Sequence, residues 1–194
     1  MNQSEFGDTP VSRCRYYRQV CGLPAIVDPP ELGRIVIRAG IVRALMMPAH
    51  LGQLVKIYLQ RRGHDIGPIV PHPRSQRWSY LVRPDLPNDD SLFAEMFRLD
   101  VSIVRAGGEI ALPSPTDRCA LFRHWIEPPR SAYRPSGQLV LASIRHLTLG
   151  ASTRHPTQPE HGAERRIRKG AERVTFPLRH IAHPQMDRPS LGGA

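Results

Sequence analysis

The spacing of hydrophobic residues predicts a strand followed by a long helix in the first half of the chain. Residues 34–38 concentrate β-branched side chains between two arginines, which is typical of a strand. In residues 48–63, apolar positions recur three and four residues apart, which predicts a helix with one buried face. Pro48 suits its first turn, and Gly63 can end it. The apolar stripe comprises Leu51, Leu54, Val55, Tyr58 and Leu59.

Alternating apolar residues predict further strands after this helix. Residues 66–70 form a short strand, and residues 77–83 form a longer one. In the longer strand, Trp78, Tyr80 and Val82 share one face because successive side chains of a strand point to opposite sides. This face combines two aromatic rings.

A second helix and a hairpin are expected next. Asp89 or Asp90 can cap a helix that carries an apolar face, because a carboxylate accepts hydrogen bonds from the first free backbone amides. The Gly107-Gly108 pair lies between the strand-like residues 99–105 and 109–112, which indicates a hairpin. The helix face comprises Leu92, Phe93, Met96 and Phe97.

The order of these elements predicts an α+β fold. A short strand over residues 122–126 and a helix opened by Ser136 complete a single domain of residues 28–149, with a mainly antiparallel sheet and about three helices. Residues 1–27 predict a partly ordered N-terminal arm. In residues 150–194 prolines interrupt every pattern, so a disordered, basic, proline-rich tail is expected.

Positive charge is the main compositional signal. The chain of 194 residues has 27 lysines and arginines against 17 acidic residues, a formal net charge of +10, and only Lys56 and Lys169 are lysines. Arginine binds phosphate oxygens in pairs, so nucleic acid is the partner that this balance favours. Codon usage in a GC-rich genome also explains the arginine bias. The chain has no apolar run long enough for a membrane span and no secretory signal, so a cytoplasmic location is expected.

The loop from His72 to Trp78 is the strongest candidate site. Its Arg74, Ser75 and Arg77 precede two strand aromatics, so phosphate contact and base stacking could occur together. The competing interpretation places the aromatics in the core and the arginines at a solvated edge. The predicted nucleic-acid-binding residues are His72, Arg74, Ser75, Arg77, Trp78 and Tyr80, with Arg165, Arg166, Arg168 and Lys169 in the tail.

Catalytic and metal chemistry have weaker signals. Asp100 and Ser102 lie two apart, where two-metal nucleotidyl transfer would need paired carboxylates, and Ser102 carries no charge. Neither a catalytic residue, nor a metal site, nor a cofactor is predicted, because the phosphate-binding, dinucleotide-binding and hydrolase motifs are missing. The cysteines have no zinc-site spacing and are expected to be free thiols, namely Cys14, Cys21 and Cys119.

A resemblance is carried by five segments, Cys21-Gly22-Leu23-Pro24-Ala25, Met47-Pro48-Ala49-His50-Leu51-Gly52, Gly67-Pro68-Ile69-Val70-Pro71-His72-Pro73-Arg74-Ser75, Leu112-Pro113-Ser114-Pro115 and Trp125-Ile126-Glu127-Pro128-Pro129-Arg130. Over about residues 14–147 the chain resembles a group of small actinobacterial proteins. Some members carry labels of bifunctional DNA primase/polymerase-like or RNA polymerase β-subunit-like proteins. The resemblance implies a nucleic-acid setting, and Ser102 departs from the paired carboxylates of a primase/polymerase.

Three functional hypotheses follow. The first is a non-catalytic, basic accessory protein that contacts nucleic acid through arginines and aromatics. The second is a primase/polymerase-like nucleotide-handling enzyme, which requires at least two further acids beside Asp100. The third is a small-ligand or protein-interaction module whose contact surface is formed by the proline-rich segments 112–116 and 127–130.

Overall fold

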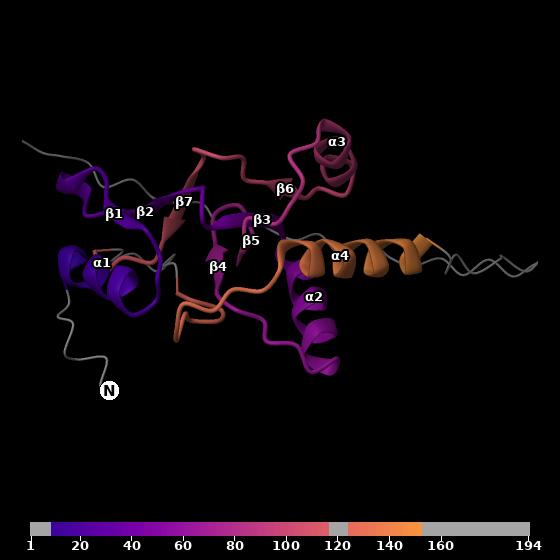
Figure 1. Ribbon diagram of the computed structural model, residues 1–194, viewed down its shortest axis with the longest axis horizontal. Helices are drawn as coiled ribbons and strands as arrows, with labels where there is room; N and C mark the ends of the chain where they lie inside the picture. The colour runs from indigo at the N-terminus through magenta and orange to yellow at the C-terminus, as the bar shows by residue number, and fades with distance from the viewer. Residues whose placement is uncertain (1–8, 117–123, 153–194) are drawn as a thin grey trace, which may run out of the picture. The chain divides into compact units, whose positions relative to one another are not determined.

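The computed structural model describes residues 9–116 and 124–152, and these form an α+β fold (Figure 1). The described residues contain four α-helices, one short 3-10 helix and two antiparallel sheets, so the predicted fold class is confirmed. The helices are α1 (Pro10–Gln19), α2 (Ala49–Arg61), α3 (Asp90–Arg98) and α4 (Gly137–Ser152), and the 3-10 helix is Pro30–Leu32.

The strands divide into a three-stranded and a four-stranded sheet. Sheet A has the order β1-β2-β7, and sheet B has the order β4-β5-β3-β6. Within sheet B, β3 pairs with β5 along its full length, from Arg43 opposite Val82 to Pro48 opposite Arg77. The strands are β1 (Ala25–Val27), β2 (Ile35–Arg38), β3 (Arg43–Pro48), β4 (Ile69–His72), β5 (Arg77–Val82), β6 (Ser102–Ile103) and β7 (Glu109–Leu112).

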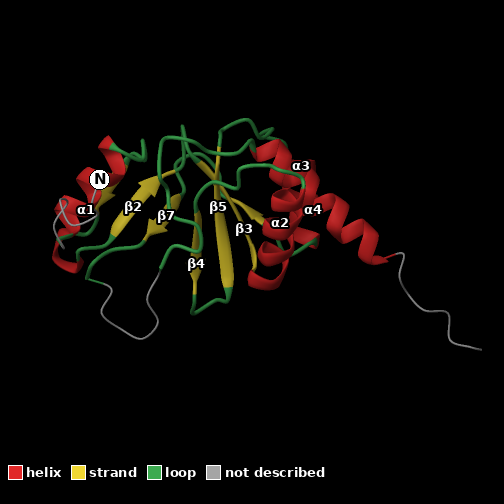
Figure 2. Cartoon of the chain, turned by 90° about the horizontal axis from the view of Figure 1, so that it is seen from below, coloured by secondary structure: helices red, strands yellow, loops and turns green. Residues whose placement is uncertain are grey.

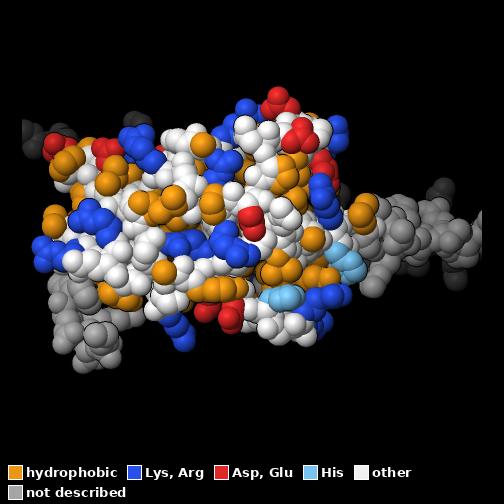
Figure 3. Space-filling view, in the orientation of Figure 1, with side chains coloured by type: hydrophobic (Ala, Val, Ile, Leu, Met, Phe, Trp, Pro, Cys, Tyr) orange, Lys and Arg blue, Asp and Glu red, His pale blue; other side chains and the backbone are white. Residues whose placement is uncertain are grey.

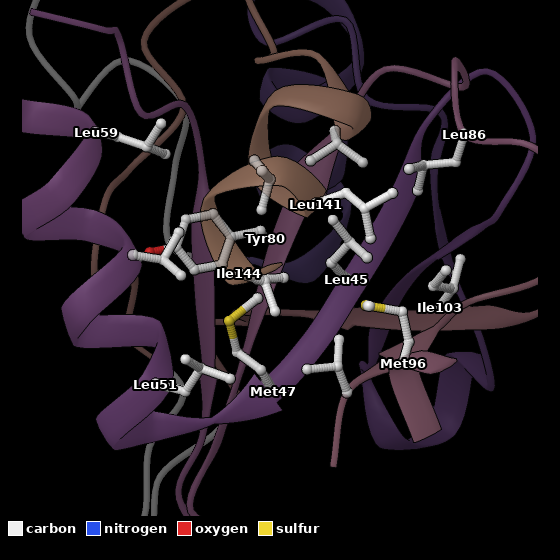
Figure 4. Packing of buried hydrophobic residues seen from close by; sticks show 14 of the residues in the cluster. Leu45, Met47, Leu51, Leu59, Tyr80, Leu86, Met96, Ile103, Leu141 and Ile144 are labelled. Atoms are coloured by element: carbon white, nitrogen blue, oxygen red, sulfur yellow. The ribbon is translucent and has the colours of Figure 1, made fainter. Parts of the chain in front are cut away.

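Two hydrophobic clusters lie on opposite faces of sheet B. The first joins this sheet to α2, α3 and α4, and Figure 4 shows Tyr80 among Leu45, Met47 and Ile144. The second joins the other face of the sheet, including Leu81, to sheet A and α1. Helices α2, α3 and α4 therefore lie together on one side of the sheet, and α1 lies by sheet A (Figure 2). Alternation along β5 explains both clusters, since even-numbered and odd-numbered side chains face opposite layers.

The helix ends follow the predicted local chemistry. The Asp89 carboxylate accepts a hydrogen bond from the Ser91 amide at 3.0 Å and caps α3. Ser136 Oγ accepts from the Leu139 amide at 3.3 Å ahead of α4. After α2, Gly63 adopts a φ of 72°, a left-handed conformation that glycine accommodates without strain.

The predicted hairpin at Gly107-Gly108 is wrong. Strand β6 pairs with β3 in sheet B, whereas β7 pairs with β2 in sheet A. The two glycines instead connect one sheet to the other. The Ala39 amide donates to the Gly108 carbonyl, and the Gly107 amide donates to the Ala39 carbonyl. The reason is tertiary, because Ile110 and Leu112 find their apolar partners in β2 and not in the preceding strand.

Several boundaries also differ from prediction. The N-terminal arm contains α1, whose Cys14 and Tyr17 are buried, and strands β1 and β3 were not predicted. In place of a strand over 122–126, the described residues 124–126 have no strand, and Glu127 directly after them forms an isolated bridge with Ile69. Residues 117–123 and 153–194 lie outside the described residues, and the predicted tail belongs almost wholly to them.

Candidate functional site

The β4–β5 hairpin presents the predicted site on a loop that is held at both ends. His72 and Arg77 are register partners where the two strands meet the loop. Within the loop, the Ser75 amide donates to the His72 carbonyl at 3.2 Å, and Gln76 adopts a left-handed φ of 52°. The Ala49 amide at the start of α2 donates to the Gln76 carbonyl at 2.9 Å. The loop is therefore tied to the helix beside it.

A groove of about 660 Å³ lies against this loop. It is formed by the end of β3 and the start of α2, by the hairpin, and by the turn between α3 and β6. Pro48 occupies the N-cap position of α2, and its side chain makes no capping hydrogen bond. The lining residues are Pro48, Ala49, His50, Pro71, His72, Pro73, Ser75, Gln76, Arg77, Trp78 and Asp100.

Trp78 forms the aromatic part of the groove. Its side chain is partly buried and packs against the first hydrophobic cluster. It can approach α2 closely because Gly52 has no side chain, and a Cβ built at Gly52 would lie 2.9 Å from Trp78 Cε3. Met47 and Pro71 are its register partners on the neighbouring strands. One part of the indole is fixed by the core while another part borders the groove.

Tyr80 was predicted to contact nucleic acid, and the structure contradicts this. The side chain is fully buried, and its hydroxyl donates to the Gly52 carbonyl at 2.7 Å. Burial raises the pKa of this phenol strongly. Tyr80 shares a face with Trp78 but lies two residues further into the sheet, below α2. It therefore supports Trp78 through Gly52 and is not accessible to a ligand.

Arg77 is largely engaged within the protein. Its guanidinium donates to Asp100 Oδ1 at 2.7 Å, to the Asp100 carbonyl at 2.7 Å and to the Met46 carbonyl at 3.1 Å. The Arg77 side chain is 18% exposed. Its charge is therefore compensated at the groove wall, in contrast to Arg74, which is exposed in the loop.

The other predicted residues have mixed positions. Ser75 is exposed and donates to the His72 carbonyl at 3.3 Å. His72 Nε2 and the buried Ser79 Oγ share a hydrogen bond of 2.8 Å, which fixes the imidazole at the end of β4. The predicted tail residues Arg165, Arg166, Arg168 and Lys169 lie outside the described residues.

Sequence reasoning did not place His50 and Asp100 in the candidate site. His50 belongs to the first turn of α2 and is exposed, and it had attracted notice only as part of a resembling segment. Asp100 had been considered as a metal ligand and not as a neighbour of Arg77. A usable signal was the position of Asp100 directly after the last apolar residues of α3, because the chain changes direction where a helix ends.

The carboxylates needed for nucleotidyl transfer do not converge on Asp100 in the described part of the chain. Within residues 9–116 and 124–152, no three histidine, cysteine, aspartate or glutamate side chains form a group that could hold a metal ion. Two neighbouring acids in the sequence, Asp85 and Asp90, bind other elements, since Asp85 accepts from Ser136 and Asp90 from Arg105.

The thiols and the surface charge add little local chemistry. Cys14 and Cys21 are free and buried, and burial raises the pKa of both thiols.

On the face seen in Figure 3, lysine and arginine side chains lie in separate patches among acidic and hydrophobic side chains. Basic charge on this face is dispersed. Among the helices of the described residues, none is long and apolar enough to cross a bilayer.

Comparison of the chain with protein-family models, with curated proteins and with solved structures found no match in any of the three. The resemblance to small actinobacterial proteins stays a prediction. The class of protein that the fold and the groove define is thus a small α+β protein with a groove that combines an indole, two imidazoles and an Arg77-Asp100 pair.

The contact between Gly52 and the indole gives a stability prediction. Replacing Gly52 with alanine is expected to lower the free energy of unfolding by about 1–2 kcal/mol, because overpacking against the ring outweighs the gain in helix propensity. Gln53→Ala, at an exposed position in the same helix, should change it by less than about 0.5 kcal/mol. Urea unfolding measures both variants. A Gly52→Ala protein more stable than the wild type would show that the indole moves aside freely.

Proposed function

We propose that this chain is a non-catalytic accessory protein that binds single-stranded nucleic acid at the groove beside the β4–β5 hairpin. The observation that carries the proposal is the meeting of a partly buried indole, Trp78, with two imidazoles in one groove, beside the exposed Arg74 of the hairpin loop. Aromatic faces hold unpaired bases by stacking, and cationic side chains next to them contact the phosphates. A duplex keeps its bases stacked inside, so an unpaired base fits this groove better.

Three further features support this proposal. The net charge of +10 favours association with a polyanion, and the exposed Arg74 adds a cationic group on the loop at the groove. The indole is held by the core at Gly52, and the loop is held by its hydrogen bond to Ala49, so little ordering is needed before a ligand binds. The resemblance to proteins with primase/polymerase-like labels points to the same setting.

A second groove favours a protein-interaction module as the other candidate function. It has a volume of about 470 Å³ and is lined by the proline-rich segment 127–131, the segment from His64 to Pro68, Gln60 and Tyr133. Prolines lose little conformational freedom when a partner binds, so such a surface suits a protein ligand. If neither oligonucleotide binds at low salt, the protein-interaction function at this second surface becomes the favoured one.

The test of the proposed function is a salt titration with labelled oligonucleotides. Fluorescence anisotropy with the full chain should show tighter binding to a single-stranded 12-mer than to the matching duplex, with affinity falling steeply as salt rises. Absence of binding to either oligonucleotide at low salt would overturn the proposal.

Arg74 is expected to contribute one phosphate contact. In Arg74→Ala, the slope of log affinity against log salt should become shallower by about 0.7, the value for one contact on a single strand. Arg61→Ala is the matched control, because Arg61 is also exposed but belongs to the last turn of α2, away from the groove. Equal slopes for the two variants would show that Arg74 contributes only through net charge.

A further inference from the structure

Asp100 occupies a backbone position where glycine is the usual residue. It follows α3 directly and has a φ of 54°. The Val101 amide donates to the Met96 carbonyl at 2.8 Å and the Asp100 amide to the Phe97 carbonyl at 3.0 Å, which together form a Schellman helix end. A residue with a Cβ is disfavoured in this conformation, although aspartate tolerates it better than most. A carboxylate kept at a strained position points to a role for the carboxylate.

The carboxylate of Asp100 is both fixed and available. Arg77 holds Oδ1 and also the backbone carbonyl, which sets the orientation of the side chain. The carboxylate side chain is nevertheless 71% exposed, and in the described residues Oδ2 accepts no hydrogen bond. Because Asp100 lines the same groove as Trp78, its unused acceptor borders the space where a stacked base would lie.

A carboxylate in this place does not serve phosphate binding, because it repels phosphate oxygens. Toward an uncharged base it acts as a hydrogen-bond acceptor, and bases are the parts of a nucleic acid that carry N–H donors at their edges. Guanine presents two adjacent donors, N1–H and the N2 amino group, which match the two oxygens of a carboxylate. Adenine, cytosine and thymine each offer a single donor group on that edge. Each carboxylate oxygen accepts more than one hydrogen bond, so Oδ1 can keep its bond to Arg77.

We propose that Asp100 makes this groove selective for guanine, by accepting hydrogen bonds from the Watson–Crick edge of a base stacked on Trp78. The inference rests on the proposed function and names the base that the same site prefers. Arg77 acts as the positioning residue, since it orients the Asp100 carboxylate from β5. The same chemistry could serve a strand or a free guanine nucleotide.

The experiment compares four thymidine 12-mers that carry a single central guanine, inosine, adenine or cytosine, bound to the full-length chain. The guanine strand should bind about tenfold more tightly than the adenine and cytosine strands. Inosine lacks the N2 amino group and keeps N1–H, so its strand should have an intermediate affinity. This comparison uses the wild-type protein and does not depend on how any variant folds.

Asp100→Asn tests the residue directly. Asparagine tolerates a positive φ, so the helix end should be kept, while one acceptor oxygen is replaced by an amide donor. The variant should still bind the strands but lose the guanine preference to within about twofold. Asp90→Asn is the control, because Asp90 is an exposed acid on α3 that pairs with Arg105 outside the groove, and its preference should equal that of the wild type. A guanine preference retained in Asp100→Asn overturns the assignment of Asp100.

The outcomes separate this inference from the proposed function. If the wild type binds all four strands equally, guanine selection is wrong and single-strand binding stands. If it binds none, the proposed function itself fails. A further measurement uses GMP as a competitor of the guanine strand. Weak competition supports a nucleic-acid strand as the ligand. If GMP binds as tightly as the guanine strand, guanine recognition is supported, but the ligand is a free nucleotide and not a strand.

Discussion

Replacing Trp78 with leucine is expected to weaken binding of a single-stranded oligonucleotide by about tenfold to a hundredfold. Stacking of one base on an aromatic side chain contributes about 1–3 kcal/mol, and leucine offers no flat aromatic surface. Leucine still fills much of the space against Gly52 and the first core cluster, so the fold should be retained. Anisotropy titration at one fixed salt concentration measures the change.

The second tryptophan provides the matched control. Trp125 lies in the other hydrophobic cluster, where its Nε1 donates to the Tyr17 hydroxyl at 3.0 Å. Trp125→Phe should therefore change stability but leave oligonucleotide affinity within about twofold. It also leaves Trp78 as the only tryptophan of the chain, whose emission should be quenched by a stacked base. If Trp78→Leu binds as tightly as the wild type, the indole takes no part in binding.

Tyr17→Phe is expected to lower the free energy of unfolding by about 2–4 kcal/mol. The buried hydroxyl donates to the Pro113 carbonyl at 2.9 Å and accepts from Trp125 Nε1, so its removal leaves a buried carbonyl and a partly buried indole N–H without this partner. The bonds span 96 and 108 residues of sequence, and they join α1 to the segments after β7 and before α4. Chemical denaturation measures the loss.

Tyr58→Phe is the control for the loss of a hydroxyl. Tyr58 is partly buried, and its ring lies 5.0 Å from that of His146, a contact that phenylalanine keeps. Its free energy of unfolding should change by less than about 0.5 kcal/mol. Equal losses in the two variants would contradict the importance of the Tyr17 hydroxyl network.

Stability at alkaline pH gives a second measurement for Tyr17. Burial raises the pKa of Tyr17 from 10.0 to about 12, since the charged phenolate is disfavoured in the core. The unfolded chain releases this proton near pH 10, so the contribution is complete below pH 10 and is lost as the pH rises through 12. The wild type should lose about 2–3 kcal/mol through this group over that range. In Tyr17→Phe this part of the pH dependence should disappear.

Parts of the candidate site were predictable because local chemistry controls them. The prolines and arginines from Pro71 to Arg77 indicated an exposed loop that enters a strand, and the structure has it as the β4–β5 hairpin. The same pattern could not show that Trp78 borders the groove while Tyr80 is buried, because both side chains lie on the same face of β5. Their difference comes from Gly52 of α2. Its missing side chain leaves room for the Trp78 ring, and its carbonyl accepts a hydrogen bond from the Tyr80 hydroxyl.

The sequence was sufficient for elements whose ends and faces are set by neighbouring residues. Helix α2 has an apolar stripe and a terminal glycine, α3 has an aspartate cap, and α4 has a serine cap, and each of these interactions spans only a few residues. The division into two sheets, the burial of Tyr80 and the pairing of Arg77 with Asp100 depended on tertiary structure. Each of these joins segments that are distant in sequence, and short-range patterns contain no information about which distant strand or side chain completes a hydrogen bond or covers an apolar face.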